Sequence, residues 1–112
     1  MSKPYAYFAD LAEDIQIPED GTLSRTIYRD DSVTAVLFGF APGQELTEHT
    51  SSMPAIIYLV KGEADLTLGG DPVDGKAGTW IHMPAQLPHS VYAKTEVVML
   101  LLMFRSARKA SS

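Results

Sequence analysis

Residues 42–63 read PGQELTEHTSSMPAIIYLVKGE, and residues 78–89 read GTWIHMPAQLPH. In the first stretch His49 lies six positions after a glycine. In the second, Pro84 lies six positions after Gly78, and His89 lies five positions after Pro84. Glycine adopts the backbone angles that tight turns require, and proline ends strand pairing. Both stretches therefore predict short strands bounded by turns, with the two histidines beside those turns.

The rest of the chain consists of short apolar or alternating stretches punctuated by glycine and proline. Almost nothing has a helical period; residues 10–17 predict one helical turn or an irregular edge segment, which Pro18 ends. Residues 69–72 predict a turn, and residues 73–77 predict a short link. The predicted strands are 22–28, 33–40, 55–60, 63–68, 79–83, 89–94 and 96–104. This spacing is typical of an antiparallel sandwich or barrel, so the predicted fold class is all-β.

The composition excludes several classes of protein. The chain has 112 residues, 46% hydrophobic and 21% charged, which suits one globular domain spanning 1–112. It has no cysteine, which excludes disulfides, thiolate metal sites and cysteine nucleophiles. The net charge of −5, without a basic stripe, argues against nucleic-acid binding. We see no membrane-spanning apolar run and no secretory signal, so we expect a cytoplasmic protein without a membrane partner.

Together the two stretches resemble the paired motifs of the cupin superfamily. The first family motif reads Gly, five residues, His-x-His, three or four residues, Glu, six residues, Gly; it falls here at about 42–63. The second reads Gly, five residues, Pro-x-Gly, two residues, His, three residues, Asn; it falls at about 78–93. The matching residues are Gly43, His49 and Gly62 in the first motif, and Gly78, Pro84 and His89 in the second.

The resemblance implies a double-stranded β-helix, the jelly-roll barrel of cupins, with a pocket between its sheets around His49 and His89. Alternate residues of a strand face the same side, so His49 and Ser51 should point together into the barrel. His89 should meet them there from another strand. A ligand pocket is mostly apolar with a few polar anchors. The residues that we expect to line it are His49, Ser51, Met53, Tyr58, Trp80, His82 and His89.

The metal ligands that the resemblance implies are only partly present. Cupins with a full site supply two histidines and a glutamate from the first motif and one histidine from the second, and they hold Fe, Mn, Ni, Zn or Cu. Here Ser51 stands at the second histidine position and Ala55 at the glutamate position. His49 and His89 remain as ligands for a divalent transition metal. The alternative is that both are ordinary loop or turn histidines.

The second motif also departs from the family pattern, since Gln86 replaces its glycine and Ala93 its asparagine. A catalytic metal site normally has three protein ligands and an open position. His82 is a candidate third ligand, or else a structural histidine that alternates with Trp80 on one face. Further oxygen donors are Glu45 and Thr47, which share a face with His49 if that segment is extended, and Gln44 nearby.

Three kinds of function remain open. The first is a protein that binds a small molecule in the barrel pocket, with or without a metal. The second is a metal-dependent dioxygenase, decarboxylase or isomerase acting on a small organic acid or sugar, in which the metal is a Lewis acid or oxygen activator. The third is a non-catalytic sensing or accessory module. Strand runs that are apolar on both faces also predict a homodimer, which would bury one outer sheet face.

Overall fold

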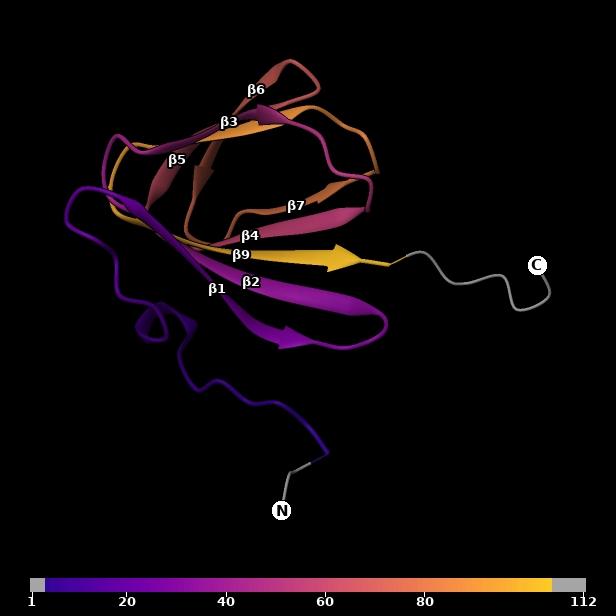
Figure 1. The fold of residues 1–112 in the computed structure, drawn as a ribbon. Coiled ribbons are helices and arrows are strands. Elements are labelled where there is room, and N and C mark those ends of the chain that lie inside the picture. Colours follow the sequence, from indigo (N-terminus) through magenta and orange to yellow (C-terminus); the bar gives the residue numbers. More distant parts are fainter. Residues whose placement is uncertain (1–3, 106–112) are drawn as a thin grey trace.

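The computed structural model describes residues 4–105 and contains two antiparallel sheets packed face to face (Figure 1). One sheet has the order β1 (Thr22–Arg29), β2 (Val33–Phe40), β9 (Val97–Phe104), β4 (Ala55–Lys61) and β7 (Trp80–Met83). The other has the order β3 (Glu45–His49), β8 (His89–Ala93), β5 (Glu63–Leu68) and β6 (Asp71–Lys76). A short 3-10 turn, η1 (Leu11–Glu13), precedes them. The predicted all-β jelly-roll fold class is confirmed.

Residues 71–76 form a strand where the sequence indicated a turn and a link. β6 pairs with β5 along its whole length, so Gly69 and Gly70 alone make the turn. Both glycines have positive φ, 59° and 89°, as a tight two-residue hairpin turn requires. Pro72 is tolerated because β6 is the edge strand of its sheet. The prediction was wrong because local turn residues dominated it, whereas pairing with β5 decides the conformation.

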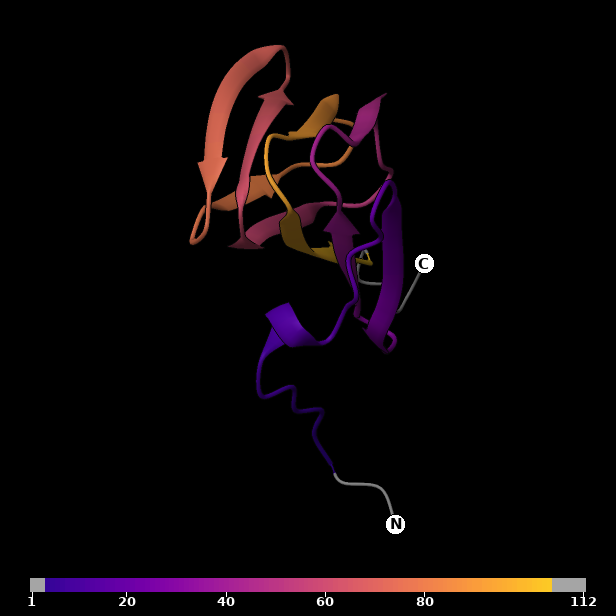
Figure 2. The ribbon, with the colours of Figure 1, turned by 90° about the vertical axis from the view of Figure 1, so that its left-hand side faces the viewer.

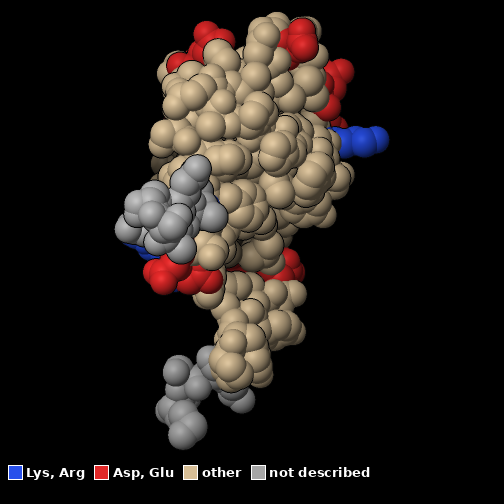
Figure 3. Space-filling model, turned by 90° about the vertical axis from the view of Figure 1, so that its right-hand side faces the viewer, with Lys and Arg blue, Asp and Glu red and all other residues tan. Residues whose placement is uncertain are grey.

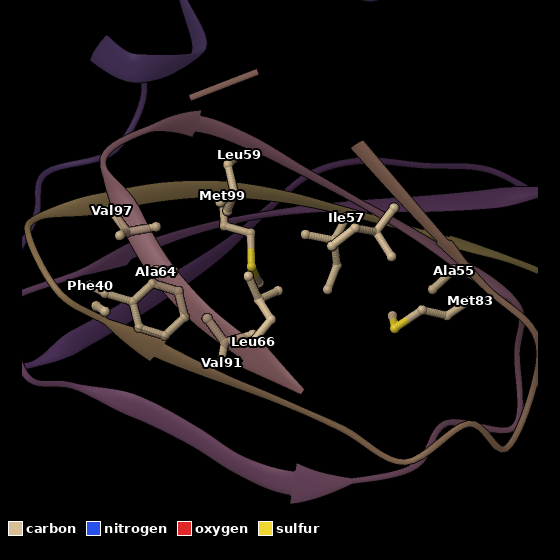
Figure 4. Close-up of a cluster of buried hydrophobic side chains, with 12 residues drawn as sticks. Phe40, Ala55, Ile57, Leu59, Ala64, Leu66, Met83, Val91, Val97 and Met99 are labelled. Carbon is tan, nitrogen blue, oxygen red and sulfur yellow. The ribbon is translucent and has the colours of Figure 1, made fainter. Parts of the chain in front are cut away.

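Alternate residues of the two sheets point toward each other and form the core (Figure 4). Along β4, Ala55, Ile57 and Leu59 are buried between the sheets, whereas Ile56 and Tyr58 face the other side. Removal of this apolar surface from water holds the sheets together. The buried residues of this core are Phe40, Ala55, Ile57, Leu59, Ala64, Leu66, Ile81, Met83, Val91, Ala93, Val97 and Met99.

Strand β9 occupies the middle of the five-stranded sheet and is apolar on both faces. Val97 and Met99 belong to the core between the sheets, whereas Val98 belongs to a second cluster on the outer face. Ile15 and Leu37 complete that cluster, so the N-terminal segment covers this part of the sheet. Among residues 4–105, no helix has the length and apolar character needed to cross a membrane.

The corner between β4 and β5 consists of Gly62 alone, with φ of 91°. A Cβ atom at this position would lie 1.9 Å from the carbonyl oxygen of Glu96, far inside contact distance. Gly43 has a similar φ of 85°, but nothing lies within 4 Å of the Cβ that it lacks. An alanine at Gly43 would therefore have only an unfavourable backbone angle, whereas an alanine at Gly62 would have both that angle and a steric clash.

We expect Gly62→Ala to lower the free energy of unfolding by roughly 3–5 kcal/mol, because left-handed strain and a backbone clash act together. The matched variant Gly43→Ala should cost only about 1–2 kcal/mol, from the backbone angle alone. Urea unfolding followed by circular dichroism measures both. Equal losses in the two variants would contradict the close approach at Gly62.

Asp30 organises the turn between β1 and β2. Its carboxylate accepts hydrogen bonds from the Tyr28 hydroxyl at 2.7 Å and from the amides of Ser32 and Val33 at 2.7 and 2.9 Å. The hydrogen bond from Tyr28, followed by those from the two amides, lowers the pKa of Asp30 below its ordinary value of 3.8. Arg105 donates to the carbonyl oxygen of Asp30 at 2.6 Å and so ties the turn to the end of β9.

A carboxyl group whose pKa is lower in the folded chain than in the unfolded chain stabilises the fold above its ordinary pKa. That contribution is lost as the pH falls through the folded value. We therefore expect wild type to have a higher Tm than Asp30→Asn at about pH 7, with the difference shrinking toward about pH 3. Differential scanning calorimetry across this range is the measurement. Asp31→Asn removes the same charge from the same turn, and a pH-dependent difference of equal size there would refute the assignment to Asp30.

Candidate functional site

The two motif histidines meet at one end of the barrel. His49 ends β3, His89 begins β8, and the two are register partners in the four-stranded sheet. Their ring centroids lie 4.3 Å apart, with the ring planes inclined at 56°. In Figure 1 this is the right-hand end, where loops 50–54 and 84–88 connect the two sheets. The structure thus brings together the two residues on which the predicted site depends.

A β-bulge in β3 determines the side of the sheet to which His49 belongs. Between Leu46 and His49, β3 advances by three residues while β8 advances by two. The extra residue returns His49 to the inner face, which it shares with Leu46 and His89. Glu45 lies on the outer face opposite the exposed Tyr92. The expectation that Glu45 shares a face with His49 was wrong, because it assumed an unbroken strand.

Each imidazole is oriented by a backbone carbonyl two residues earlier in the chain. Nδ1 of His49 lies 2.8 Å from the carbonyl oxygen of Thr47, and Nδ1 of His89 lies 2.9 Å from that of Leu87. A carbonyl oxygen only accepts hydrogen bonds, so both Nδ1 atoms carry a proton and donate it. In the neutral rings the lone pair is therefore on Nε2. Metal-binding histidines are commonly oriented by the same kind of contact.

The pair extends from the core to the solvent. His89 is only 6% exposed, and it is the one polar side chain in the described part of the chain that counts as buried. On its other side its register partner is Leu68, which packs against the core. His49 is exposed. A molecule that contacts both rings would therefore be only partly enclosed.

An apolar wall lies at the same end of the barrel. Ala55, at the position of the family's glutamate, is 2% exposed, and its register partners in the five-stranded sheet are Met83 and Met103. Ala55 and Met83 belong to the core, and Met103 packs against it. At this motif position an alkyl group thus replaces a carboxylate, and the site combines two ring nitrogens with apolar surface.

Ser51 and Met53 lie in loop 50–54 and not on a strand, since β3 ends at His49. The Ser51 hydroxyl accepts a hydrogen bond from the Met53 amide at 3.1 Å, and the Ser51 carbonyl accepts one from the Gln86 amide at 2.7 Å. Strand alternation therefore does not place Ser51, contrary to the assumption behind the prediction, and its place in the pocket stays a prediction. Ser51 instead ties the two loops at the mouth together.

Three residues expected in the pocket lie on the outer face of the five-stranded sheet. Along β7, Ile81 and Met83 are buried, whereas Trp80 and His82 are exposed. Tyr58 is the register partner of Trp80 and is also exposed. The expectation that Tyr58, Trp80 and His82 line the barrel was wrong. The sequence did not show which alternate set of each strand faces inward, since both sets contain large apolar or aromatic residues.

The donor set limits what metal the site can hold. Within residues 4–105 no three His, Cys, Asp or Glu side chains are grouped as metal ligands. His82 is on the outer face and does not join the pair. Two imidazoles fall short of the three protein ligands of a usual catalytic centre. The site therefore suits a metal only if water or a bound molecule completes the coordination.

The surface at this end of the molecule is largely uncharged. Figure 3 views the molecule from the right-hand side of Figure 1, and few charged side chains lie across the middle of that face. Asp and Glu gather toward its upper and lower margins. Most of the described residues visible in the middle of this face are therefore uncharged.

Sequence reasoning missed the backbone parts of this site. The carbonyl groups of Thr47 and Leu87 fix the imidazoles, and Gln86 holds a left-handed φ of 69° in the loop before His89. Carbonyl groups are alike at every position, so no residue type marks them. The one available signal was Gln86 itself, which stands where the family motif has a glycine.

Comparisons with known proteins agree on the fold. The family model described as the cupin domain matches residues 36–104. The chain is similar to the structure of a conserved protein of unknown function from Streptococcus pyogenes, with 30% identity, coverage of 94% of this chain and 92% of that chain, and a TM-score of 0.82. A cupin superfamily protein from Desulfitobacterium hafniense is 25% identical, with coverage of 92% and 94% and a TM-score of 0.83.

More distant structures share the fold alone. KdgF from Halomonas is 23% identical, with coverage of 91% of this chain and 96% of that chain and a TM-score of 0.73. A search of curated proteins found no match.

Replacing Gln86 by glycine tests the backbone strain beside the site. The left-handed angle destabilises the folded state by about 1–2 kcal/mol for a non-glycine residue, and glycine removes this strain. Glycine also makes the unfolded chain more flexible, which lowers the free energy of unfolding by about 0.4–1 kcal/mol. We therefore expect Gln86→Gly to raise the free energy of unfolding by roughly 0.5 kcal/mol, measured by urea unfolding. Ala85→Gly, in the same loop but without a positive φ, should lower it. A loss of stability in Gln86→Gly would show that the glutamine side chain itself holds the loop.

Proposed function

The chain belongs to the cupin family, and we propose that it binds a small molecule at the barrel mouth, with His49 and His89 as the polar anchors. The observation that carries this proposal is the matched pair of imidazoles, 4.3 Å apart between centroids, each with Nδ1 tied to a carbonyl. That arrangement leaves two Nε2 atoms as the chemically distinctive groups of the site. Two such atoms beside apolar side chains are typical of a ligand site.

The chemistry of the mouth selects a class of ligand. A neutral imidazole accepts a hydrogen bond at Nε2, so a hydroxyl or a protonated carboxyl group suits each ring; an imidazolium donates instead, which suits a carboxylate. Ala55, Met83 and Met103 favour an apolar body behind that polar head. We therefore propose a small organic acid or alcohol with one polar end and one apolar end.

A second candidate function is binding of a divalent transition metal by His49 and His89. The two Nδ1–H groups donated to carbonyl oxygens favour it, because this contact directs the Nε2 lone pair of a metal ligand. With only two imidazoles from the chain, the ligand itself would have to supply further donor atoms. Imidazole nitrogens suit Zn, Ni, Cu and Fe, so the residue types alone do not identify the metal.

The first test is a thermal-shift screen of small organic acids, alcohols and sugars, with titration calorimetry on the compounds that raise Tm. A compound that binds the folded chain must stabilise it. We expect His49→Ala and His89→Ala each to weaken binding by at least about tenfold, equivalent to about 1.4 kcal/mol, because each loses one anchor. His82→Ala is the matched control on the outer face and should bind as wild type does. Equal binding by all three variants would place the ligand elsewhere.

The metal candidate is tested separately by titrating the uncomplexed protein with Zn²⁺ while recording the imidazole ¹⁵N resonances. The chain has three histidines, so each resonance can be assigned by a single substitution. If the candidate is correct, the Nε2 signals of His49 and His89 shift and that of His82 does not. Shifts at His82 alone, or at none of the three, would rule out a metal at the mouth while leaving metal-independent binding standing.

A further inference from the structure

A row of register partners crosses the inner face of the five-stranded sheet at the barrel mouth. From one edge of the sheet to the other it consists of Arg29, Thr34, Met103, Ala55 and Met83. Ala55 and Met83 belong to the core between the sheets, and directly opposed residues of paired strands share a face. In Figure 1 the row lies at the right-hand end, where β1 and β9 end. The mouth therefore has apolar side chains in the middle of this row and a cationic side chain at one edge.

Arg105 joins Arg29 at this edge of the mouth. It directly follows β9, and its amide donates a hydrogen bond to the carbonyl oxygen of Ser32 at 2.9 Å. Its half-buried guanidinium donates to the carbonyl oxygen of Asp30 at 2.6 Å and to the Thr34 hydroxyl at 2.7 Å. Thr34 is also the register partner of Arg29. Two arginines are thus neighbours of one threonine on the inner face, and two hydrogen bonds fix the orientation of one guanidinium.

No carboxylate of the described chain forms an ion pair with either arginine. The ion pairs among residues 4–105 are Lys61 with Glu96 and Lys94 with Asp65. Asp30 uses its carboxylate for the Tyr28 hydroxyl and two amides, and it offers Arg105 only its carbonyl oxygen. A guanidinium has five N–H donors, so Arg105 keeps further donors after its two hydrogen bonds. The positive charge at this edge of the mouth is therefore available to an anion.

The inner face of β1 is open to solvent. Figure 2 shows β1 at the side of the barrel away from the hairpin of β5 and β6. Thr22 and Ser24 of β1 are register partners of Phe40 and Phe38, which pack in the core, yet both are exposed. Arg29, at the end of the same strand, is exposed as well. This open side leads from solvent to the arginines and from there to the apolar middle of the row.

We propose that Arg29 and Arg105 form an anion subsite of the mouth, which binds a carboxylate of the ligand while the ligand's other end reaches His49 and His89. The inference rests on the proposed function and narrows its ligand class. Guanidinium groups bind carboxylates through paired N–H donors, and the Thr34 hydroxyl adds a donor beside them. An anion between the two arginines also offsets the repulsion between their like charges.

The apolar middle of the row determines the form of the ligand. Thr34 and Ala55 are two strands apart, which corresponds to about 10 Å, and Met103 lies between them. An alkyl or ring body suits this interval. At the far end a neutral imidazole accepts a hydrogen bond from a hydroxyl group. The ligand class is therefore a hydroxy acid, in which an apolar body separates the carboxylate from the hydroxyl group.

Titration calorimetry of the full chain with ω-hydroxy acids of about four to eight carbons tests this, because these lengths bracket a span of about 10 Å. The α,ω-diols of the same lengths are matched probes without a carboxylate. We expect the best acid to bind wild type at least about tenfold more tightly than its diol, and added salt to weaken only the acid. Arg29→Gln and Arg105→Gln should each weaken the acid by about tenfold and leave the diol within about twofold. The matched control is Arg25→Gln on the outer face of β1, which should bind both probes as wild type does.

Arg29 is exposed, so Arg29→Gln keeps the test decisive even if Arg105→Gln folds poorly. Arg29→Lys keeps the charge without the paired donors and should recover part of the acid's affinity. Equal affinities for acid and diol, or an acid affinity unchanged in Arg29→Gln, would overturn the subsite. So would a wild type that binds none of the acids at about 10 mM.

The variant His49→Ala separates this inference from the proposed function. If the arginine variants have no effect but His49→Ala weakens both probes, the subsite is wrong and the proposed function stands. If the acid depends on the arginines but binds His49→Ala as tightly as wild type, the subsite stands and the proposed role of the histidine pair is wrong.

Discussion

The two-residue period of β-strands is the constraint on which this structure depends. Each strand presents alternate residues to opposite faces, and the two sheets are stable only when their apolar sets turn toward each other. In β7 this places Ile81 and Met83 in the core and sends Trp80 and His82 outward. In β9 it divides an almost uniformly apolar run between the core and the outer cluster around Val98. The core and the outer cluster around Val98 both follow from this division.

The candidate site exists because that period is interrupted in β3. The bulge in β3 adds one residue between Leu46 and His49, which moves His49 from the outer to the inner face and opposite His89. Two backbone carbonyls then hold both rings with Nε2 as the available atom. The surroundings are apolar, with Ala55 and its methionine neighbours where a carboxylate would stand in a full cupin metal site. Under the proposed function, these groups suit a polar group on an apolar molecule better than a bare cation.

The resemblance to the paired cupin motifs predicted that His49 and His89 meet, and the fold shows how they do so. His49 and His89 flank turns marked by glycine and proline, and antiparallel pairing of the flanking strands brings such positions together. The same reasoning failed for Ser51, Tyr58, Trp80 and His82. Each failure has a structural cause. β3 ends before Ser51. In β4 and β7 both faces are apolar, so the sequence could not show which set of alternate residues faces the core. The strand β6 was missed because Gly69 and Gly70 make a tighter turn than the polar segment around them indicated.

By itself the sequence determined the all-β class and most strand positions, and its resemblance to the cupin motifs predicted the histidine pair and the loss of the other motif ligands. These follow from residue identity and local spacing, which need no knowledge of long-range contacts. Only the tertiary structure decided which face of each strand is buried, where the bulge falls, and how the carbonyls of Thr47 and Leu87 orient the rings. Those features depend on pairing between strands far apart in the chain. A shift of one residue in such pairing moves every side chain of a strand to the opposite face, so local sequence alone cannot specify them.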